Sequence, residues 1–285
     1  MSKLKIAIQK NGRLHDESLK LLKDCGISVN NGRDQLKVVI DNFPWEILYL
    51  RNSDIPQYIE DGTADIGIVG ENLLFEKQKQ VDVVEKLGFS KCRVSLALPK
   101  EVNDNSPYYL EGKKIATSYP NTLRYYLNNK GIKAEIHTIS GSVEIAPNIG
   151  LADGICDIVS SGSTLFKNGL RETQVIFKSE AVLVKSQNLS FEQEAILEKL
   201  VFRIKAVLRA KNSKYILLNV PNEKIKAVTN ILPVLKSPTI LPLAQEGWSS
   251  LHSVIDENKF WEVIDELKTA GAEDILIVPI DKMVI

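Results

Sequence analysis

The chain has 285 residues, of which 44% are hydrophobic and 25% are charged, as is typical of a globular protein. Lys plus Arg and Asp plus Glu both number 36, so no bulk charge favours nucleic acid or an anionic membrane surface. The length predicts two or three domains, because one hydrophobic core does not comfortably serve so long a chain.

Cysteine spacing and the lack of targeting signals exclude further classes. Cys25, Cys92 and Cys156 lie far apart, which argues against a zinc site and against a disulfide framework. Residues 1–6 lack the apolar core of a signal peptide, and no stretch is long enough to span a bilayer. The sequence therefore predicts a cytoplasmic protein without nucleic-acid or membrane partners.

The first part of the chain predicts one α/β lobe. A strand begins at residues 5–7, and a polar turn and a helix follow it. Farther along, residues 62–66 lead to Gly70 and then to Leu73.

The second part repeats this arrangement. A strand begins at residues 114–116, a Pro-opened helix follows, and residues 154–158 lead at identical spacing to Gly162 and Leu165. The repeat predicts two lobes of the periplasmic-binding-protein type (type II), each with a mostly parallel sheet. Ligands of such sheets bind at the carboxyl ends of the strands, so facing turns would form a cleft for two substrates.

The next segment connects the lobes to the C-terminal part. Residues 169–184 predict one strand that returns toward the first lobe. Residues 190–193 form a capping box, and apolar periodicity from Ile196 to Leu208 predicts a long amphipathic helix.

The C-terminal part predicts a ferredoxin-like βαββαβ domain. Its expected elements are strands at 215–220, 239–243, 251–255 and 275–278, with helices at about 221–232 and 260–270. The aromatic residues Trp248, Phe260 and Trp261 are expected in its core, because each buries a large area.

The most informative stretch is the end of the predicted strand 155–159. Five small residues follow it, and if Leu165 opens a helix, their N–H groups and hydroxyls form an anion cradle beside Asp157. A phosphorylated sugar suits this arrangement, because the acid can bind ribose hydroxyls while the N–H groups hold the phosphate. The alternative is a turn rich in Ser and Gly only because such residues cap helices. The five residues are Ser160, Ser161, Gly162, Ser163 and Thr164.

A longer pattern around this stretch resembles the signature of the ATP phosphoribosyltransferase family, which catalyses the first step of histidine biosynthesis. The matching positions are Glu144, Gly150, Ala152, Ile155, Asp157, Ile158, Ser161, Gly162, Thr164 and Leu165. The resemblance also covers residues 9–14, 65–72, 92–93 and 116–120, and the length resembles the long form that carries a regulatory domain.

The resemblance implies a pentosyltransferase that joins N1 of the ATP adenine to C1 of 5-phosphoribosyl 1-pyrophosphate (PRPP) and expels pyrophosphate. It assigns the sugar 5′-phosphate to residues 160–164 and the ribose hydroxyls to Asp157, with Mg²⁺ bound mainly through pyrophosphate oxygens. Glu144 is a candidate for catalysis through ribose or magnesium contacts. Its alternative role is that of an acid in the first turn of a helix.

The ATP side is predicted from residues after strands and at helix starts. Most have a simpler alternative: a solvated Asn-Gly turn after the first strand, helix-start chemistry after Gly70, or surface ion pairs for the isolated arginines. Ser118 and Tyr119 precede Pro120, so a helix start is expected to face the cleft there. The candidates are Lys10, Gly12, Arg13, Arg51, Gly70, Glu71, Asn72, Arg93, Ser118 and Tyr119.

The resemblance further implies that the C-terminal domain binds histidine as a feedback inhibitor, with AMP as a second possible inhibitor and a dimer or hexamer as the assembly. Candidate histidine-site residues are Thr239, Leu241 and Ala272. The expected domains are a first lobe at 1–91 plus about 179–210, a second lobe at 92–178 and a regulatory domain at 211–285.

Two other functions compete with the transferase. A non-catalytic bilobal binder conflicts with the missing signal peptide and with candidate ATP residues in the first lobe. A nucleic-acid-binding regulator lacks a basic stripe and a helix-turn-helix segment.

Overall fold

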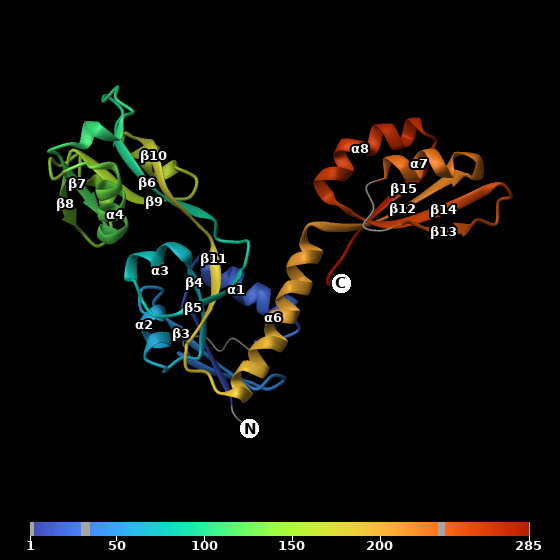
Figure 1. The fold of residues 1–285 in the computed structure, drawn as a ribbon, viewed down its shortest axis with the longest axis horizontal. Helices are drawn as coiled ribbons and strands as arrows, with labels where there is room; N and C mark the ends of the chain where they lie inside the picture. The colour runs from blue at the N-terminus through green and yellow to red at the C-terminus, as the bar shows by residue number, and fades with distance from the viewer. Residues whose placement is uncertain (1–2, 30–34, 233–236, 285) are drawn as a thin grey trace. The chain divides into compact units, whose positions relative to one another are not determined.

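A computed structural model describes residues 3–29, 35–232 and 237–284 (Figure 1). The chain forms three sheets and separates into two compact units, residues 1–198 and 199–285. The boundary between the units falls within helix α6 (Phe191–Lys211). Within the described residues, no helix is both long enough and apolar enough to span a membrane.

The first sheet defines lobe I, with strand order β2-β3-β1-β4-β11-β5. Strands β3, β1 and β4 run parallel, and the others pair antiparallel to their neighbours. The parallel centre reads as continuous apolar sequence because both of its faces are covered. Its strands are β1 (Leu4–Gln9), β2 (Lys37–Ile40), β3 (Trp45–Leu50), β4 (Ile66–Gly70), β5 (Asp82–Lys86) and β11 (Ala181–Lys185), and its helices are α1 (Arg13–Asp24), α2 (Ile55–Glu60) and α3 (Glu71–Lys77).

The second sheet defines lobe II, with strand order β10-β6-β9-β7-β8. Strands β9, β7 and β8 run parallel, whereas β6 and β10 are antiparallel additions at one edge. Its strands are β6 (Cys92–Pro99), β7 (Lys114–Thr117), β8 (Glu135–Thr138), β9 (Gly154–Val159) and β10 (Leu170–Ser179), and its helices are α4 (Pro120–Lys130), α5 (Ser163–Lys167) and the short 3₁₀ turns η1 (Pro107–Leu110) and η2 (Val143–Ile145).

The two-lobed α/β fold is therefore confirmed, but both sheets are mixed rather than mostly parallel. The segment 169–184 accounts for part of the difference, because it is two strands and not one. The first, β10, pairs with β6 in lobe II, and the second, β11, pairs with β4 and β5 in lobe I. Only Glu180 separates them.

The two lobes repeat the same order of strands and helices, but the residues aligned by the sequence spacing do not occupy equivalent positions in the two sheets. The sequence spacing matches Ile66 with Ile158, whereas the strand pairing matches Ile66 with Gly154, since each stands opposite the corresponding residue of β1 or β7. Asp65 consequently lies before β4, at the amino edge of the lobe I sheet, where it accepts hydrogen bonds from the Lys5 N–H and the Gln193 amide. It is not a counterpart of Asp157.

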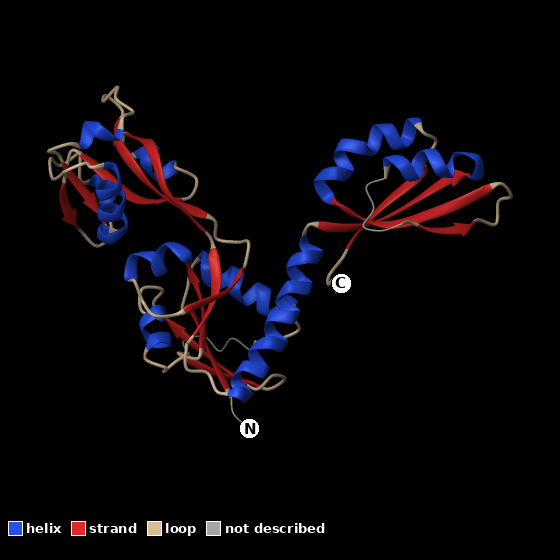
Figure 2. Cartoon of the chain, in the orientation of Figure 1, coloured by secondary structure: helices blue, strands red, loops and turns tan. Residues whose placement is uncertain are grey.

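The third sheet has strand order β13-β14-β12-β15, and all its pairs are antiparallel. This order confirms the ferredoxin-like prediction, with helices α7 and α8 on one face of the sheet (Figure 2). The elements are β12 (Ser213–Pro221), the 3₁₀ turn η3 (Asn222–Lys224), α7 (Ile225–Ile231), β13 (Thr239–Pro242), β14 (Trp248–Asp256), α8 (Glu257–Thr269) and β15 (Glu273–Pro279).

The aromatic prediction for this domain is wrong at one position. Phe260 is buried in the core, whereas Trp261 is 70% exposed. The buried face of α8 contains Phe260 and Leu267, one apolar stripe at helical spacing, and the next residue after Phe260 points away from it. Trp248 is partly buried.

Candidate active site

The loop after β9 has the backbone geometry of a tight turn. Gly162 adopts φ 79°, a left-handed conformation that favours glycine, and α5 then begins at Ser163 rather than at the predicted Leu165. The hydroxyls of Ser161 and Ser163 lie 3.0 Å apart, and the Ser163 N–H points at the Ser161 Oγ at 3.4 Å. The loop therefore gathers hydroxyls and N–H groups at the carboxyl edge of β9.

Asp157 lies within β9, close to this loop. Burial raises the pKa of its carboxyl to about 6, the Ile158 N–H acts in the opposite direction, and the nearby Glu144 carboxylate raises it further. Glu144 lies in the short turn η2, which follows β8. The two acids that the sequence pattern singled out are thus brought into electrostatic contact.

Two arginines converge on Ser160, the first residue of the loop. Arg93 Nη1 donates to the Ser160 carbonyl at 3.0 Å, and Arg13 Nη1 lies 3.4 Å from the Ser160 Oγ. Arg13 comes from the start of α1 in lobe I, whereas Arg93 comes from β6 in lobe II. Both residues were predicted on the ATP side, and the structure places both at the start of the predicted phosphate loop.

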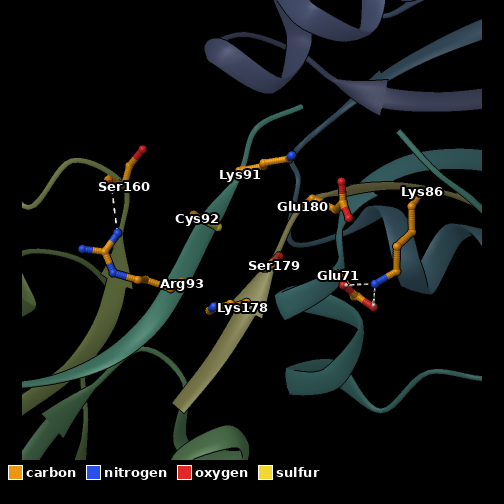
Figure 3. Close-up of a pocket in the computed structure, with 9 residues that line it drawn as sticks. All are labelled: Glu71, Lys86, Lys91, Cys92, Arg93, Ser160, Lys178, Ser179 and Glu180. Carbon is orange, nitrogen blue, oxygen red and sulfur yellow. Dashed lines mark hydrogen bonds and ion pairs between the residues drawn. The ribbon is translucent and has the colours of Figure 1, made fainter. Parts of the chain in front are cut away.

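A pocket of about 460 Å³ lies where the chain crosses between the lobes (Figure 3). It is lined by four cationic and two acidic side chains, so it favours an anionic ligand. The lining residues are Glu71, Lys86, Lys91, Cys92, Arg93, Ser160, Lys178, Ser179 and Glu180. Lys86 is paired with Glu71 at 3.2 Å, whereas the side chains of Lys91 and Lys178 are exposed and have no hydrogen-bond or ion-pair partner within the described residues.

Several ATP candidates share the carboxyl edge of the lobe I sheet. Lys10 follows β1 and Arg51 follows β3, and because Gln9 pairs with Leu50, the two cationic residues leave neighbouring strands at the same edge. Both side chains are exposed. Gly12 has φ 90° and precedes α1, which allows the backbone to turn sharply there.

Asn72 is predicted as an ATP ligand, but its side chain already serves the fold. Its amide Nδ2 donates to the Tyr119 hydroxyl at 3.3 Å, and its Oδ1 accepts from the Ser179 hydroxyl at 2.9 Å. Only 5% of the residue is exposed. Glu71, by contrast, lines the pocket, and its backbone N–H bonds the Glu180 carbonyl.

The N-terminus of α4 is also occupied by contacts within the protein. Glu76 of α3 accepts hydrogen bonds from the N–H groups of Asn121 and Thr122 and from the Thr122 hydroxyl, all at 2.9–3.1 Å. The Ser118 hydroxyl donates to the Ile139 carbonyl at 2.9 Å, and burial raises the pKa of the Tyr119 hydroxyl. A phosphate at this helix start would have to displace a carboxylate.

Sequence reasoning missed the residues whose role depends on long-range contacts. Lys91 and Lys178 lie on either side of the crossing between the lobes, and Glu172 lies on β10 against Arg93. Glu76 pairs with residues 45 and 46 positions away. Lys91, which directly precedes the Cys92-Arg93 pair, was the one local signal available.

The candidate residues offer few ligands for a divalent metal. Within the described ranges, no group of three or more His, Cys, Asp or Glu side chains could enclose an ion. A single partly buried carboxylate at Glu144 beside Asp157 suits a hard cation that takes its other oxygens from substrate phosphates and water. The residues therefore fit a metal that is carried largely by substrate.

The predicted histidine-site residues differ in exposure: two are on the surface and one is buried. Thr239 and Leu241 lie on the exposed edge strand β13, whereas Ala272 is 4% exposed and its N–H already donates to the Leu267 carbonyl. The side chain of Ala272 has no open face for a ligand.

A two-lobed α/β unit with a cationic pocket at its crossing is typical of proteins that bind anionic small molecules. Comparison with known proteins narrows this class. The family model described as "HisG: ATP phosphoribosyltransferase" matches residues 51–206, and "HisG, C-terminal domain" matches residues 210–282.

Similar proteins of named activity span the whole chain. An ATP phosphoribosyltransferase from Cytophaga hutchinsonii is 59% identical over 99% of this chain and 98% of its own, and one from Phocaeicola vulgatus is 52% identical over 99% and 100%. Among solved structures, an ATP phosphoribosyl transferase (HisG:HisZ) complex from Thermotoga maritima has a TM-score of 0.59, with 31% identity over 71% of this chain and 98% of that one. A periplasmic sulfonate-binding protein from Methylobacillus flagellatus, at 16% identity and a TM-score of 0.50 over 72% and 67%, shares the fold alone.

The chain belongs to the ATP phosphoribosyltransferase family. Its function is therefore the transfer of the 5-phosphoribosyl group of PRPP to N1 of the adenine of ATP, in histidine biosynthesis, with release of pyrophosphate. The reaction of this family requires a divalent metal.

Proposed function

We propose that the β9–α5 loop holds the 5′-phosphate of PRPP, with residues 160–164 around it and Asp157 on the ribose hydroxyls. The observation that carries this assignment is the tight turn at Gly162, which sets hydroxyls and N–H groups next to a partly buried acid. Cationic side chains at the adjoining pocket supply the field that a pyrophosphate leaving group needs.

ATP occupies the lobe I side of the same opening. Lys10 and Arg51 reach its phosphates from the carboxyl ends of β1 and β3, and Gly12 and Gly70 let the backbone approach. Glu71, which begins α3 and lines the pocket, is the candidate that binds the adenine or its ribose. Asn72 and Tyr119 hold the start of α3 through their mutual contact, and Ser118 holds the turn before α4 through the Ile139 carbonyl.

The chain performs this chemistry without a protein nucleophile, because adenine N1 already carries a lone pair. Its work is to align N1 with C1 of the sugar and to stabilise charge that develops as pyrophosphate leaves. With a pKa of about 6, the Asp157 carboxyl is ionised at neutral pH and accepts hydrogen bonds from the ribose hydroxyls. One well-aimed group of this kind is worth roughly 3 kcal/mol in comparable sites.

The metal that the family requires is Mg²⁺ in this proposal, held mainly by pyrophosphate oxygens. Glu144 is its one candidate ligand from the chain, or else a ribose contact. When bound, the ion neutralises charge on the leaving group. The reaction takes place in the cytoplasm, where its substrate ATP is abundant.

Steady-state kinetics with each substrate varied test the assignment. Asp157→Asn and Ser161→Ala should raise KM for PRPP or lower kcat while KM for ATP is retained. Ser106→Ala is the matched control, because Ser106 also caps a turn of lobe II but follows β6 at the opposite edge of the sheet. Wild-type kinetics in both loop variants would refute the assignment.

Residues 211–285 form a regulatory domain in this proposal, after lobe I (1–91 and about 179–210) and lobe II (92–178). It binds histidine near Thr239 and Leu241, with Ala272 contributing only the position of its loop, and AMP is a second inhibitor. Assembly is a dimer that forms a hexamer on inhibition. Product formation and size-exclusion chromatography, each with and without histidine, test these statements together, and unchanged rate and size would refute them.

A further inference from the structure

Glu172 holds Arg93 in a bidentate ion pair. Arg93 Nε and Nη2 each lie 2.5 Å from one oxygen of the Glu172 carboxylate, and about three quarters of the carboxylate side chain is shielded from solvent, with 26% exposed. Such a fork fixes the plane of the guanidinium as well as its distance. The Arg93 guanidinium holds the pKa of the Glu172 carboxyl below its usual value, so the pair is ionised at neutral pH.

A buried serine fixes Glu172 in turn. The Ser95 hydroxyl donates to Glu172 Oε1 at 2.7 Å, and Ser95 is 1% exposed. Ser95 and Arg93 lie on one face of β6, two residues apart, and Asp157 stands opposite Ser95 on β9. The Ser95 hydroxyl therefore lies between two acids and is committed to Glu172.

A β-bulge on β10 brings Glu172 to this face. The register with β6 shifts between Glu172 and Gln174, so that Thr173 is the extra residue. Bulges of this kind redirect a side chain beside a functional site. Glu172 stands opposite Ala97, on the same face as Ser95, from where it reaches Arg93.

The guanidinium nitrogen of Arg93 that does not contact Glu172 binds the β9–α5 loop. Arg93 Nη1 donates to the backbone carbonyl of Ser160 at 3.0 Å (Figure 3). Three of the five N–H donors of the side chain are thus used by Glu172 and Ser160, and the others are left for a ligand in the pocket that Arg93 lines. Without the fork, Arg93 would be free to rotate away from the carbonyl.

We propose that Glu172 is a positioning residue for phosphoribosyl transfer: it fixes Arg93 so that Arg93 anchors the first carbonyl of the β9–α5 loop for PRPP. This inference rests on the proposed placement of PRPP in that loop. Glu172 itself touches no substrate and acts through Arg93 and Ser95.

The experiment compares Glu172→Gln, Arg93→Lys and the double variant in assays of pyrophosphate release. Glu172→Gln should raise KM for PRPP about ten-fold, which corresponds to about 1.4 kcal/mol, and leave KM for ATP unchanged. Because both residues act through one contact, the double variant should bind PRPP no worse than Arg93→Lys alone. Glu172→Asp, which keeps the charge, should recover part of the affinity.

Glu194→Gln is the matched control. Glu194 pairs with Lys185 in lobe I at the same 2.5 Å, with 37% and 27% of the two side chains exposed. It should lower the thermal stability to a similar extent and leave both KM values as in the wild type.

Three results would overturn the inference: an unchanged KM for PRPP in Glu172→Gln, an equal rise in both KM values, or the same rise in Glu194→Gln. If Asp157→Asn and Ser161→Ala raise KM for PRPP while Glu172→Gln does not, this inference alone is wrong. If those two loop variants have no effect, the placement of PRPP is wrong. Should Glu172→Gln fail to fold, the Glu172→Asp and Arg93→Lys variants test the inference in its place. A rise in KM for PRPP without a rise in KM for ATP would support it, and an equal change in both would overturn it.

Discussion

Replacing Asp157 by Asn should make the folded protein more stable at neutral pH while it impairs catalysis. Asp157 is held partly out of water, and burial raises the pKa of its carboxyl from 3.8 to about 6. An acid whose pKa is higher in the folded state than in the unfolded state lowers stability wherever it is ionised. The neutral amide removes this penalty.

The magnitude follows from the shift in pKa. A change of about 2 units at 1.36 kcal/mol each gives about 3 kcal/mol as an upper limit. Below about pH 4 the carboxyl is protonated in both states and the penalty is absent. The penalty grows as pH rises from 4 to 6 and is complete above 6, so the advantage of Asp157→Asn should follow the same course.

Urea denaturation at a series of pH values, in buffer with a metal chelator, measures this difference. Hydrogen exchange of peptides from β9 should localise the change to lobe II. A variant that is no more stable than the wild type at pH 8, or whose advantage is the same at pH 4, would refute the electrostatic reasoning.

Three further substitutions test the structure. Gly162→Ala should lower the unfolding free energy by about 1 kcal/mol in urea titrations, because φ is 79° there, although the added methyl meets no atom closer than 4.0 Å; an unaltered midpoint would contradict this. Gly67→Ala should lower it by about 1–3 kcal/mol, since the new Cβ would lie 2.7 Å from Ile59 Cδ1, and a wild-type melting temperature would show that lobe I adapts. Glu76→Gln should lower the unfolding free energy by about 2 kcal/mol in thermal denaturation, because the buried Glu76 side chain loses hydrogen bonds from the Thr122 N–H and hydroxyl. A loss of stability smaller than that caused by a Glu→Gln change at an exposed position would refute this role.

Features set by near neighbours in the chain could be predicted from the sequence. The capping box at the start of α6 is one: the Ser190 N–H donates to the Gln193 side chain at 2.9 Å, and the Gln193 N–H points back at the Ser190 hydroxyl at 3.3 Å. The βαββαβ order is another, because strand and helix periodicities alternate clearly there. The exposure of Trp261 could also have been read from helical spacing, since it falls beside the Phe260–Leu267 stripe.

Features set by distant pairing could not be predicted. The two strands on either side of Glu180 look like one continuous extended segment in the sequence, and only their partners, β6 in one sheet and β4 in the other, separate them. The same limit hid Glu172, which lies 79 positions from Arg93 and depends on a bulge for its direction. Asn72 was read as a ligand because the sequence does not show that Ser179 and Tyr119 bind its amide.

The place of β11 in the lobe I sheet has a consequence for synthesis of the chain on the ribosome. Strands β4 and β5 follow each other in sequence but do not pair, because β11 lies between them. All of lobe II must therefore be translated before this sheet can close, and β4 presents an open edge until residues 181–185 leave the exit tunnel. During that interval, the open edge of β4 in one nascent chain is available to pair with the same edge of another, which is the kind of contact that starts aggregation.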